Sequence, residues 1–328
     1  MTLPEINFAA RLIEIKQLAP PIDIFSLAQE YATVVRVTFP VQIDGVCLDL
    51  KQQGKRPRIL VNRTLHKHRL RFTLAHELGH VIIPWHVGSI VDETEESRID
   101  LGLIYWQLEG EANRFASELL MPSAWATGML AGAKSPIAGA EFISAAAEVS
   151  FLAAMIKAQN LLPKGYLFAR FDGDDLMSSG RTHGTLASMP RVGKARAANL
   201  FPYAANHWMK SNGSEEYHVW RFDEEAPIAE STRPWRDIFD EISNDIGVSS
   251  TELNKFKQRV MAVISNANST TRTSRTPEAV NSAAIQRLQA NVGEIPHLEK
   301  FIRHPSFNEL LASKVAEFFG KRALKASG

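Results

Sequence analysis

Apolar residues recur along the first part of the chain at two spacings, which predict helices and short strands. Spacings of three and four residues predict helices at 6–17 and 23–32. Alternating or β-branched residues predict strands, at 34–39, 46–50 and 58–62. We expect this small sheet to pack on the apolar helix predicted at 72–83.

A second helical pattern occupies residues 109–121. Its alanines, leucines and one phenylalanine form an apolar stripe at helical spacing, and Pro122 ends it. Three more helical stretches follow, the last over 148–160, before the turn-forming residues 162–165. These residues are the predicted domain junction.

The rest of the chain mixes strands and helices. Strand patterns occur at 166–171 and 216–222, and residues 235–264 have helical spacing. Residues 266–282 are rich in Asn, Ser and Thr and predict a linker, while 307–324 predict an amphipathic helix. The predicted fold class is therefore α+β, with three parts: a domain of helices and a small sheet at 1–162, a smaller α+β domain at 163–265 that we interpret as a sensor or substrate-docking domain, and a polar linker with a C-terminal helix at 266–328.

The helix predicted at 72–83 contains the sequence His76-Glu77-Leu78-Gly79-His80. Two histidines four residues apart lie on one helical face and can bind a single Zn²⁺, and the glutamate between them is placed to act as a general base. The alternative is that these residues occur together by chance on a surface helix that binds no metal. The apolar surroundings argue against it, because buried polar groups need partners.

A catalytic zinc ion takes three protein ligands, so a third ligand is expected downstream. Glu109 and Asn113 lie four residues apart and predict a carboxylate ligand with a polar supporting residue one turn later. Glu111 is the competing ligand, but it points about 200° away around the helix, so the two glutamates cannot both face the metal. We favour Glu109, and we interpret Glu111 and Glu118 as part of a solvated face.

These two blocks, at residues 71–80 and 109–122, resemble the ImmA/IrrE family of bacterial metallopeptidases. The resemblance covers residues 1–162 and implies that this part is a zincin-like metallopeptidase domain. It implies a zinc-dependent endopeptidase whose ligands are His76, His80 and Glu109. It also implies a protein substrate, a helix-turn-helix repressor, whose cleavage switches on a stress, mobile-element or phage-defence operon.

Three other residues near the motif are candidates for supporting roles. His86 follows Pro84, which breaks the helix after His80, and it is a candidate oxyanion donor or an ordinary loop histidine. Tyr105 is a second candidate oxyanion donor. Asp92 opens an acidic run and is a candidate latency switch at the fourth metal position, or one residue of a solvated loop.

Composition and charge limit the partners and the function classes that this chain can have. The net charge of +1 implies no strong overall attraction to nucleic acid or anionic lipid. The single cysteine, Cys47, excludes intrachain disulfides and thiolate zinc clusters, and its alternating strand predicts a buried thiol. No signal peptide and no membrane-length apolar run is evident, so we expect a cytoplasmic protein without membrane contact.

Two basic segments are candidate binding surfaces. Residues 51–71 carry eight Lys or Arg and no acidic residue. These basic side chains either steer an anionic substrate towards the protein or form a solvated face. Residues 164–210 combine seven basic residues with Phe168, Phe171, Phe201, Tyr203 and Trp208. This mixture predicts either single-stranded DNA binding through residues 163–265 or aromatic residues in a core.

Two function classes therefore remain for the chain. The first is a zinc endopeptidase gated by its C-terminal part through single-stranded DNA or a small ligand. The second is a zinc-containing sensor, or a toxin–antitoxin partner, that binds its target without cutting it. Glu77 favours the first class, because a purely structural zinc site has no use for a general base.

Overall fold

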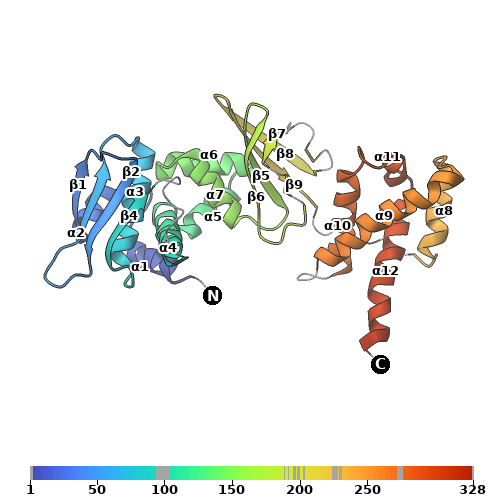
Figure 1. The fold of residues 1–328 in the computed structure, drawn as a ribbon, viewed down its shortest axis with the longest axis horizontal. Helices are drawn as coiled ribbons and strands as arrows, with labels where there is room; N and C mark the ends of the chain where they lie inside the picture. The colour runs from blue at the N-terminus through green and yellow to red at the C-terminus, as the bar shows by residue number, and fades with distance from the viewer. Residues whose placement is uncertain are drawn as a thin grey trace. The chain divides into compact units, whose positions relative to one another are not determined.

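A computed structural model describes most of the 328-residue chain (Figure 1). The described residues are 3–93, 103–187, 189–190, 192–194, 197, 200–201, 204–223, 228, 231–271 and 276–326. Within them the fold is α+β, with twelve helices and two small sheets. The chain divides into two compact units, Met1–Leu161 and Leu162–Gly328, and each is described separately.

The first unit begins with two helices and contains the first sheet. Its sheet has the strand order β1-β3-β2-β4, in which β1 and β3 are parallel and the other neighbours are antiparallel. The elements are α1 (Pro4–Lys16), α2 (Ile24–Tyr31), β1 (Thr33–Val37), β2 (Ile43–Leu50), β3 (Arg58–Asn62), α3 (Lys67–Ile82), β4 (Gly88–Glu93), α4 (Leu103–Leu120), α5 (Ser123–Ala131), α6 (Pro136–Ala147) and α7 (Phe151–Leu161).

Helix α3 is the centre of this unit. It packs against β2 and β3 on one side and against α4 on the other. Gly79 makes the approach of α4 close, because a Cβ atom there would lie 3.1 Å from Phe115 Cδ1 and 3.4 Å from Ala112 Cα. The small residue in the motif therefore brings the two helices that carry the predicted ligands together.

The second unit begins with an antiparallel sheet of strand order β7-β6-β5-β9-β8. Its strands are β5 (Tyr166–Asp172), β6 (Asp175–Arg181), β7 (Gly193–Lys194), β8 (Asn206–Asn212) and β9 (Glu215–Arg221). Alternate residues of β5, including Leu167 and Phe171, form a buried cluster with Trp220 of β9. The strands predicted at 166–171 and 216–222 correspond to β5 and β9.

Five helices complete the second unit and share one buried apolar cluster. They are α8 (Trp235–Asp245), α9 (Ser250–Thr270), α10 (Pro277–Ala290), α11 (Leu298–Ile302) and α12 (Phe307–Ala326). The linker predicted at 266–282 is wrong in its described parts: residues 266–270 end α9, and residues 277–282 begin α10. Val280 and Ala284 of α10 are fully buried, and this packing outweighs the low helix propensity of the Asn- and Ser-rich sequence.

The described helices include none that is both long enough and apolar enough to span a membrane.

The basic run at 51–71 makes contacts within the first unit. Arg58 pairs with Asp49, Lys67 pairs with Glu148, and Lys51 Nζ donates to the carbonyl oxygens of His80 and Val81 at 2.7 and 2.8 Å. These contacts favour the interpretation of this run as a structural face.

Candidate metal site

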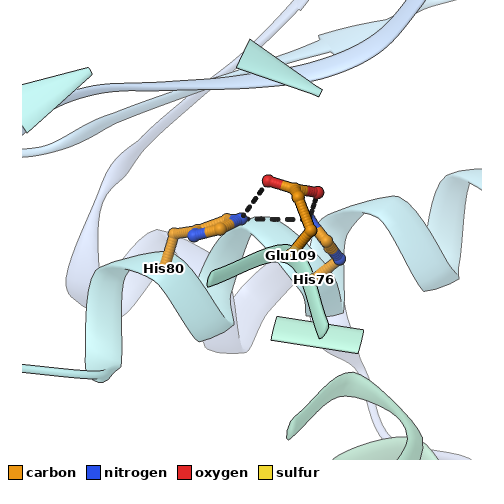
Figure 2. A group of neighbouring side chains, drawn as sticks. All are labelled: His76, His80 and Glu109. Carbon is orange, nitrogen blue, oxygen red and sulfur yellow. Dashed lines mark hydrogen bonds and ion pairs between the residues drawn. The ribbon is translucent and has the colours of Figure 1, made fainter. Parts of the chain in front are cut away.

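Three side chains from α3 and α4 converge in the buried interior of the first unit (Figure 2). His76 Nε2 and His80 Nε2 lie 3.0 Å apart. Glu109 Oε2 lies 3.2 Å from His76 Nε2, and Glu109 Oε1 lies 3.4 Å from His80 Nε2. Among the described residues, these three form the cluster of His, Cys, Asp and Glu side chains that could hold a metal ion.

The distances in this cluster match those that a small tetrahedral cation requires. Zinc bonds of about 2.0–2.1 Å to nitrogen and oxygen place neighbouring ligand atoms about 3.3 Å apart in a tetrahedron. The separations of 3.0–3.4 Å lie around that value. Two imidazoles and one carboxylate are also the ligand set of many catalytic zinc sites.

A second observation favours a cation between these three residues. Glu109 Oε1 is buried and makes no hydrogen bond of good geometry within the described part of the chain. His76 Nδ1 lies 3.0 Å from Asn113 Oδ1, an acceptor, so Nδ1 carries the ring proton and Nε2 presents its lone pair towards Glu109. Lone pairs and a carboxylate at such distances repel each other unless a positive charge lies between them.

The protonation states also suit a metal. Burial lowers the pKa of His80 to about 4, which leaves the imidazole neutral at pH 7. For Glu109 burial raises the pKa, but the nearby His76 and His80 side chains outweigh this effect, and the pKa falls to about 2. Neutral imidazole and ionised carboxylate are the forms that bind metal ions.

Glu77 is held on the sheet side of α3. Its side chain is 1% exposed, and a Cβ atom at Gly45 of β2 would lie only 2.3 Å from Glu77 Oε1. The buried Cys47 thiol donates to the Glu77 carbonyl oxygen at 3.2 Å. Burial raises the pKa of the Cys47 thiol well above its usual value, so at neutral pH this group is a protonated donor and not a nucleophile.

The structure brings His76, His80, Glu109 and Asn113 together, and it places the other candidates elsewhere. His86 is fully buried behind His80: its Nδ1 lies 2.7 Å from His80 Nδ1, the ring nitrogen opposite the one that faces Glu109. This geometry contradicts the expected oxyanion role, because an oxyanion donor must face the reacting carbonyl.

Tyr105 and Asp92 stay as sequence predictions. Tyr105 lies on α4, one turn before Glu109, and its ring contacts Trp106. Asp92 belongs to β4, but its side chain lies outside the described residues.

Two glutamates expected on a solvated face are buried. Glu111 accepts hydrogen bonds from His86 Nε2 at 3.0 Å, Trp85 Nε1 at 2.6 Å and Gln107 Nε2 at 2.8 Å. Glu118 pairs with the buried Lys157 at 2.7 Å. Sequence reasoning considered Glu111 and His86 near the site but missed the contact between them, because this contact joins a loop to a helix and leaves no periodic signal.

The sequence of the first unit matches a known family. Residues 22–158 match the Peptidase_M78 model, described as the IrrE N-terminal-like domain. This part of the chain is an IrrE N-terminal-like domain. The match contains His76, Glu77, His80, Glu109 and Asn113 and ends just before the boundary between the two units.

Other comparisons add little to this family assignment. No curated protein sequence matches the chain. A solved structure described as a Mycobacterium tuberculosis transcriptional regulator is 12% identical, with a TM-score of 0.43 over 67% of this chain and 76% of that chain. At this TM-score the likeness establishes no common fold.

The aromatic residues expected to stack on nucleic acid lie largely in the core of the second unit. Phe168 and Phe171 are buried, and the Phe201 ring packs on Trp220 and Phe222. Trp208 is half-buried and stacks on Tyr166, whereas Tyr203 lies outside the described residues. This arrangement favours the core interpretation for the phenylalanines.

Proposed function

We propose that this chain is a zinc-dependent endopeptidase that cleaves a helix-turn-helix transcriptional repressor. The observation that carries the proposal is the convergence of His76, His80 and Glu109 within a segment that matches the IrrE N-terminal-like domain, with Glu77 next to His76 in the same helix. His76, His80 and Glu109 would hold Zn²⁺, which when bound lowers the pKa of water and polarises the scissile carbonyl. Repressor cleavage rests on the family resemblance, as does its consequence for a stress, mobile-element or phage-defence operon.

The residues of the chain supply proton transfer and rigidity in this mechanism. The Glu77 carboxylate takes the proton of the attacking water and delivers it to the leaving amine nitrogen. Asn113 holds the His76 ring by accepting from Nδ1 at 3.0 Å. Burial of Glu77 between α3 and Gly45 restricts the carboxylate to few orientations, which favours efficient proton transfer.

Two substitutions separate metal binding from chemistry. Glu77→Gln removes the proton acceptor and leaves the three ligands in place, so we expect zinc content near that of the unmodified protein with cleavage lost. His80→Ala removes a ligand, so both zinc and cleavage should be lost. Zinc is measured by elemental analysis, and cleavage by electrophoresis of a helix-turn-helix protein encoded beside this chain. Retained proteolysis in Glu77→Gln would refute the mechanism.

We further propose that the second unit gates the cleavage through single-stranded DNA or a small ligand. Its support is the basic composition of residues 164–210. The same cleavage assay with and without a single-stranded oligonucleotide tests this proposal. Cleavage that needs the oligonucleotide supports it, and cleavage of equal rate in both lanes rejects DNA as the gating ligand.

The alternative function is a zinc-containing sensor or toxin–antitoxin partner that binds its target without cutting it. It predicts a stable complex in which the repressor stays intact after prolonged incubation with the zinc-loaded protein. Size-exclusion chromatography followed by mass spectrometry distinguishes the two functions. The position of Glu77 in α3, next to the candidate ligand His76, favours cleavage, because a purely structural zinc site has no use for a general base.

A further inference from the structure

A chain of buried hydrogen bonds runs from His80 away from the metal ligands. His80 Nδ1 lies 2.7 Å from His86 Nδ1, and His86 Nε2 lies 3.0 Å from Glu111 Oε2. His80 and His86 are fully buried, and Glu111 is 5% exposed. His86 follows α3 in the loop before β4, whereas Glu111 lies on α4 two residues after Glu109.

The direction of these hydrogen bonds follows from the carboxylate at the end. An ionised carboxylate only accepts, so the atom of His86 that faces Glu111, Nε2, must carry the proton. A neutral imidazole carries one proton, and therefore His86 Nδ1 has a lone pair and accepts. His80 Nδ1 must then be the donor, which leaves the lone pair of His80 on Nε2.

Two other donors contact the Glu111 carboxylate at the end of this chain. Trp85 Nε1 donates to Oε2 at 2.6 Å, and Gln107 Nε2 donates to Oε1 at 2.8 Å. Both oxygens of Glu111 therefore accept hydrogen bonds: Oε2 from His86 and Trp85, and Oε1 from Gln107. On the other side of the site, Asn113 Oδ1 lies 3.0 Å from His76 Nδ1.

We propose that His86 and Glu111 are positioning residues that hold His80 in the tautomer whose Nε2 lone pair faces Glu109 and the metal. This inference rests on the proposed zinc site and extends it beyond the ligands. Without a partner at Nδ1, the His80 proton would lie on Nε2 in part of the molecules, because Glu109 Oε1 is an acceptor only 3.4 Å away. Each such molecule would have to lose or move that proton before His80 bound a metal ion.

Three substitutions separate this role from simple packing. His86→Leu removes the acceptor for His80 Nδ1, and Glu111→Leu removes the group that sets the His86 tautomer. His86→Asn is the conservative variant, since its Oδ1 is bonded to Cγ as Nδ1 is in histidine and so offers an acceptor at the same place. Trp85→Phe is the matched control, because it removes a donor from the same carboxylate and leaves the contact between His86 and Glu111.

The first readout is the His80 tautomer in the metal-free, full-length protein, measured by ¹⁵N-detected imidazole NMR at neutral pH. We expect the Nδ1–H form in the unmodified protein, in His86→Asn and in Trp85→Phe. We expect a shift towards the Nε2–H form in His86→Leu and Glu111→Leu. An unchanged tautomer in both leucine variants would overturn the proposal.

The second readout is zinc affinity, measured by competition with a chromophoric chelator on protein whose folding is checked by circular dichroism. Loss of a group that supports a metal-bound histidine weakens metal binding about 10- to 100-fold, and we expect this loss in His86→Leu and Glu111→Leu. His86→Asn should recover most of the affinity, and Trp85→Phe should stay within about twofold of the unmodified protein, a change well below that range. Equal weakening in His86→Asn and His86→Leu would indicate packing and would overturn the proposal.

The two readouts keep this inference distinct from the proposed function. If the unmodified protein binds no zinc, the proposed function fails, and the NMR measurement still decides whether His86 and Glu111 set the tautomer. If zinc binds and repressor is cleaved while the tautomer is the same in all variants, the proposed function holds and the positioning role is rejected.

Discussion

At the scale of single residues, Gly45 shows how closely the sheet approaches the proposed general base. A Cβ atom at this position would lie 2.3 Å from Glu77 Oε1 and 2.8 Å from Thr73 Cγ2. Both separations are far below van der Waals contact, so a methyl group must displace the carboxylate, the strand or both. A glycine of β2 is therefore a requirement of the site, although no sequence motif marks it.

We expect Gly45→Ala to lose most of the peptidase activity and to lower the free energy of unfolding by about 1–3 kcal/mol, the usual cost of overpacking. Gly128→Ala is the matched control, because a Cβ atom there meets no atom within 4 Å apart from its chain neighbours and the nearby backbone of its own helix. Urea unfolding and the cleavage rate check both variants. Unchanged activity in Gly45→Ala would show that the Glu77 carboxylate is not confined by this strand.

The sequence predicted part of the site at this scale. Helical spacing placed His76 with His80 and Glu109 with Asn113, and the structure brings all four together. Sequence spacing also separated Glu109 from Glu111, and the two carboxylates do face different partners. The burial of Glu111 could not be predicted, because it depends on His86 and Trp85 in a loop whose path is set by tertiary packing.

At the scale of elements, a buried ion pair joins α4 to α7. Lys157 Nζ lies 2.7 Å from Glu118 Oε2, and both residues are less than 10% exposed. Glu118 also accepts from Ser123 N at 2.9 Å, so it fixes the turn between α4 and α5. This contact ties the ligand-bearing helix to the last helices of the first unit.

Removing one member of this pair leaves a buried charge without its partner. We expect Lys157→Met to lower the free energy of unfolding by about 3–5 kcal/mol. Adding Glu118→Gln to the same protein should recover part of that loss, since the neutral amide can still accept from Ser123. Guanidinium unfolding of the single and double variants measures both values. A double variant no more stable than Lys157→Met would show that the loss comes from packing and not from the charge.

Periodicity predicted the elements of the first unit better than those of the second. The strand at 58–62 has its predicted bounds, and the helices at 6–17 and 23–32 correspond to α1 and α2 within two residues at each end. By contrast, β8 was missed because its exposed, polar sequence from 206 to 212 has weak alternation. The linker prediction at 266–282 failed because burial against the other helices, and not local composition, stabilises α10.

At the scale of the whole molecule, the residues of the candidate metal site lie in the first unit, and the residues proposed to gate cleavage lie in the second. The metal cluster, Glu77, His86 and Glu111 all lie within Met1–Leu161. The second unit has its own buried clusters, one on its sheet and one among α8–α12. A unit with its own core can fold by itself, so the two functions should be separable by cutting the chain between them.

We therefore expect a fragment of residues 1–161 to fold, to bind one zinc ion and to retain Glu77-dependent cleavage. If the second unit is the gate, the fragment should cleave the repressor at the same rate with and without the oligonucleotide, whereas the full chain should respond. Circular dichroism and zinc analysis check the folding, and the cleavage assay checks the gating. A folded, zinc-bound fragment that no longer binds or cleaves the repressor would instead assign substrate docking to the second unit, because the chemistry would be intact and only recognition lost.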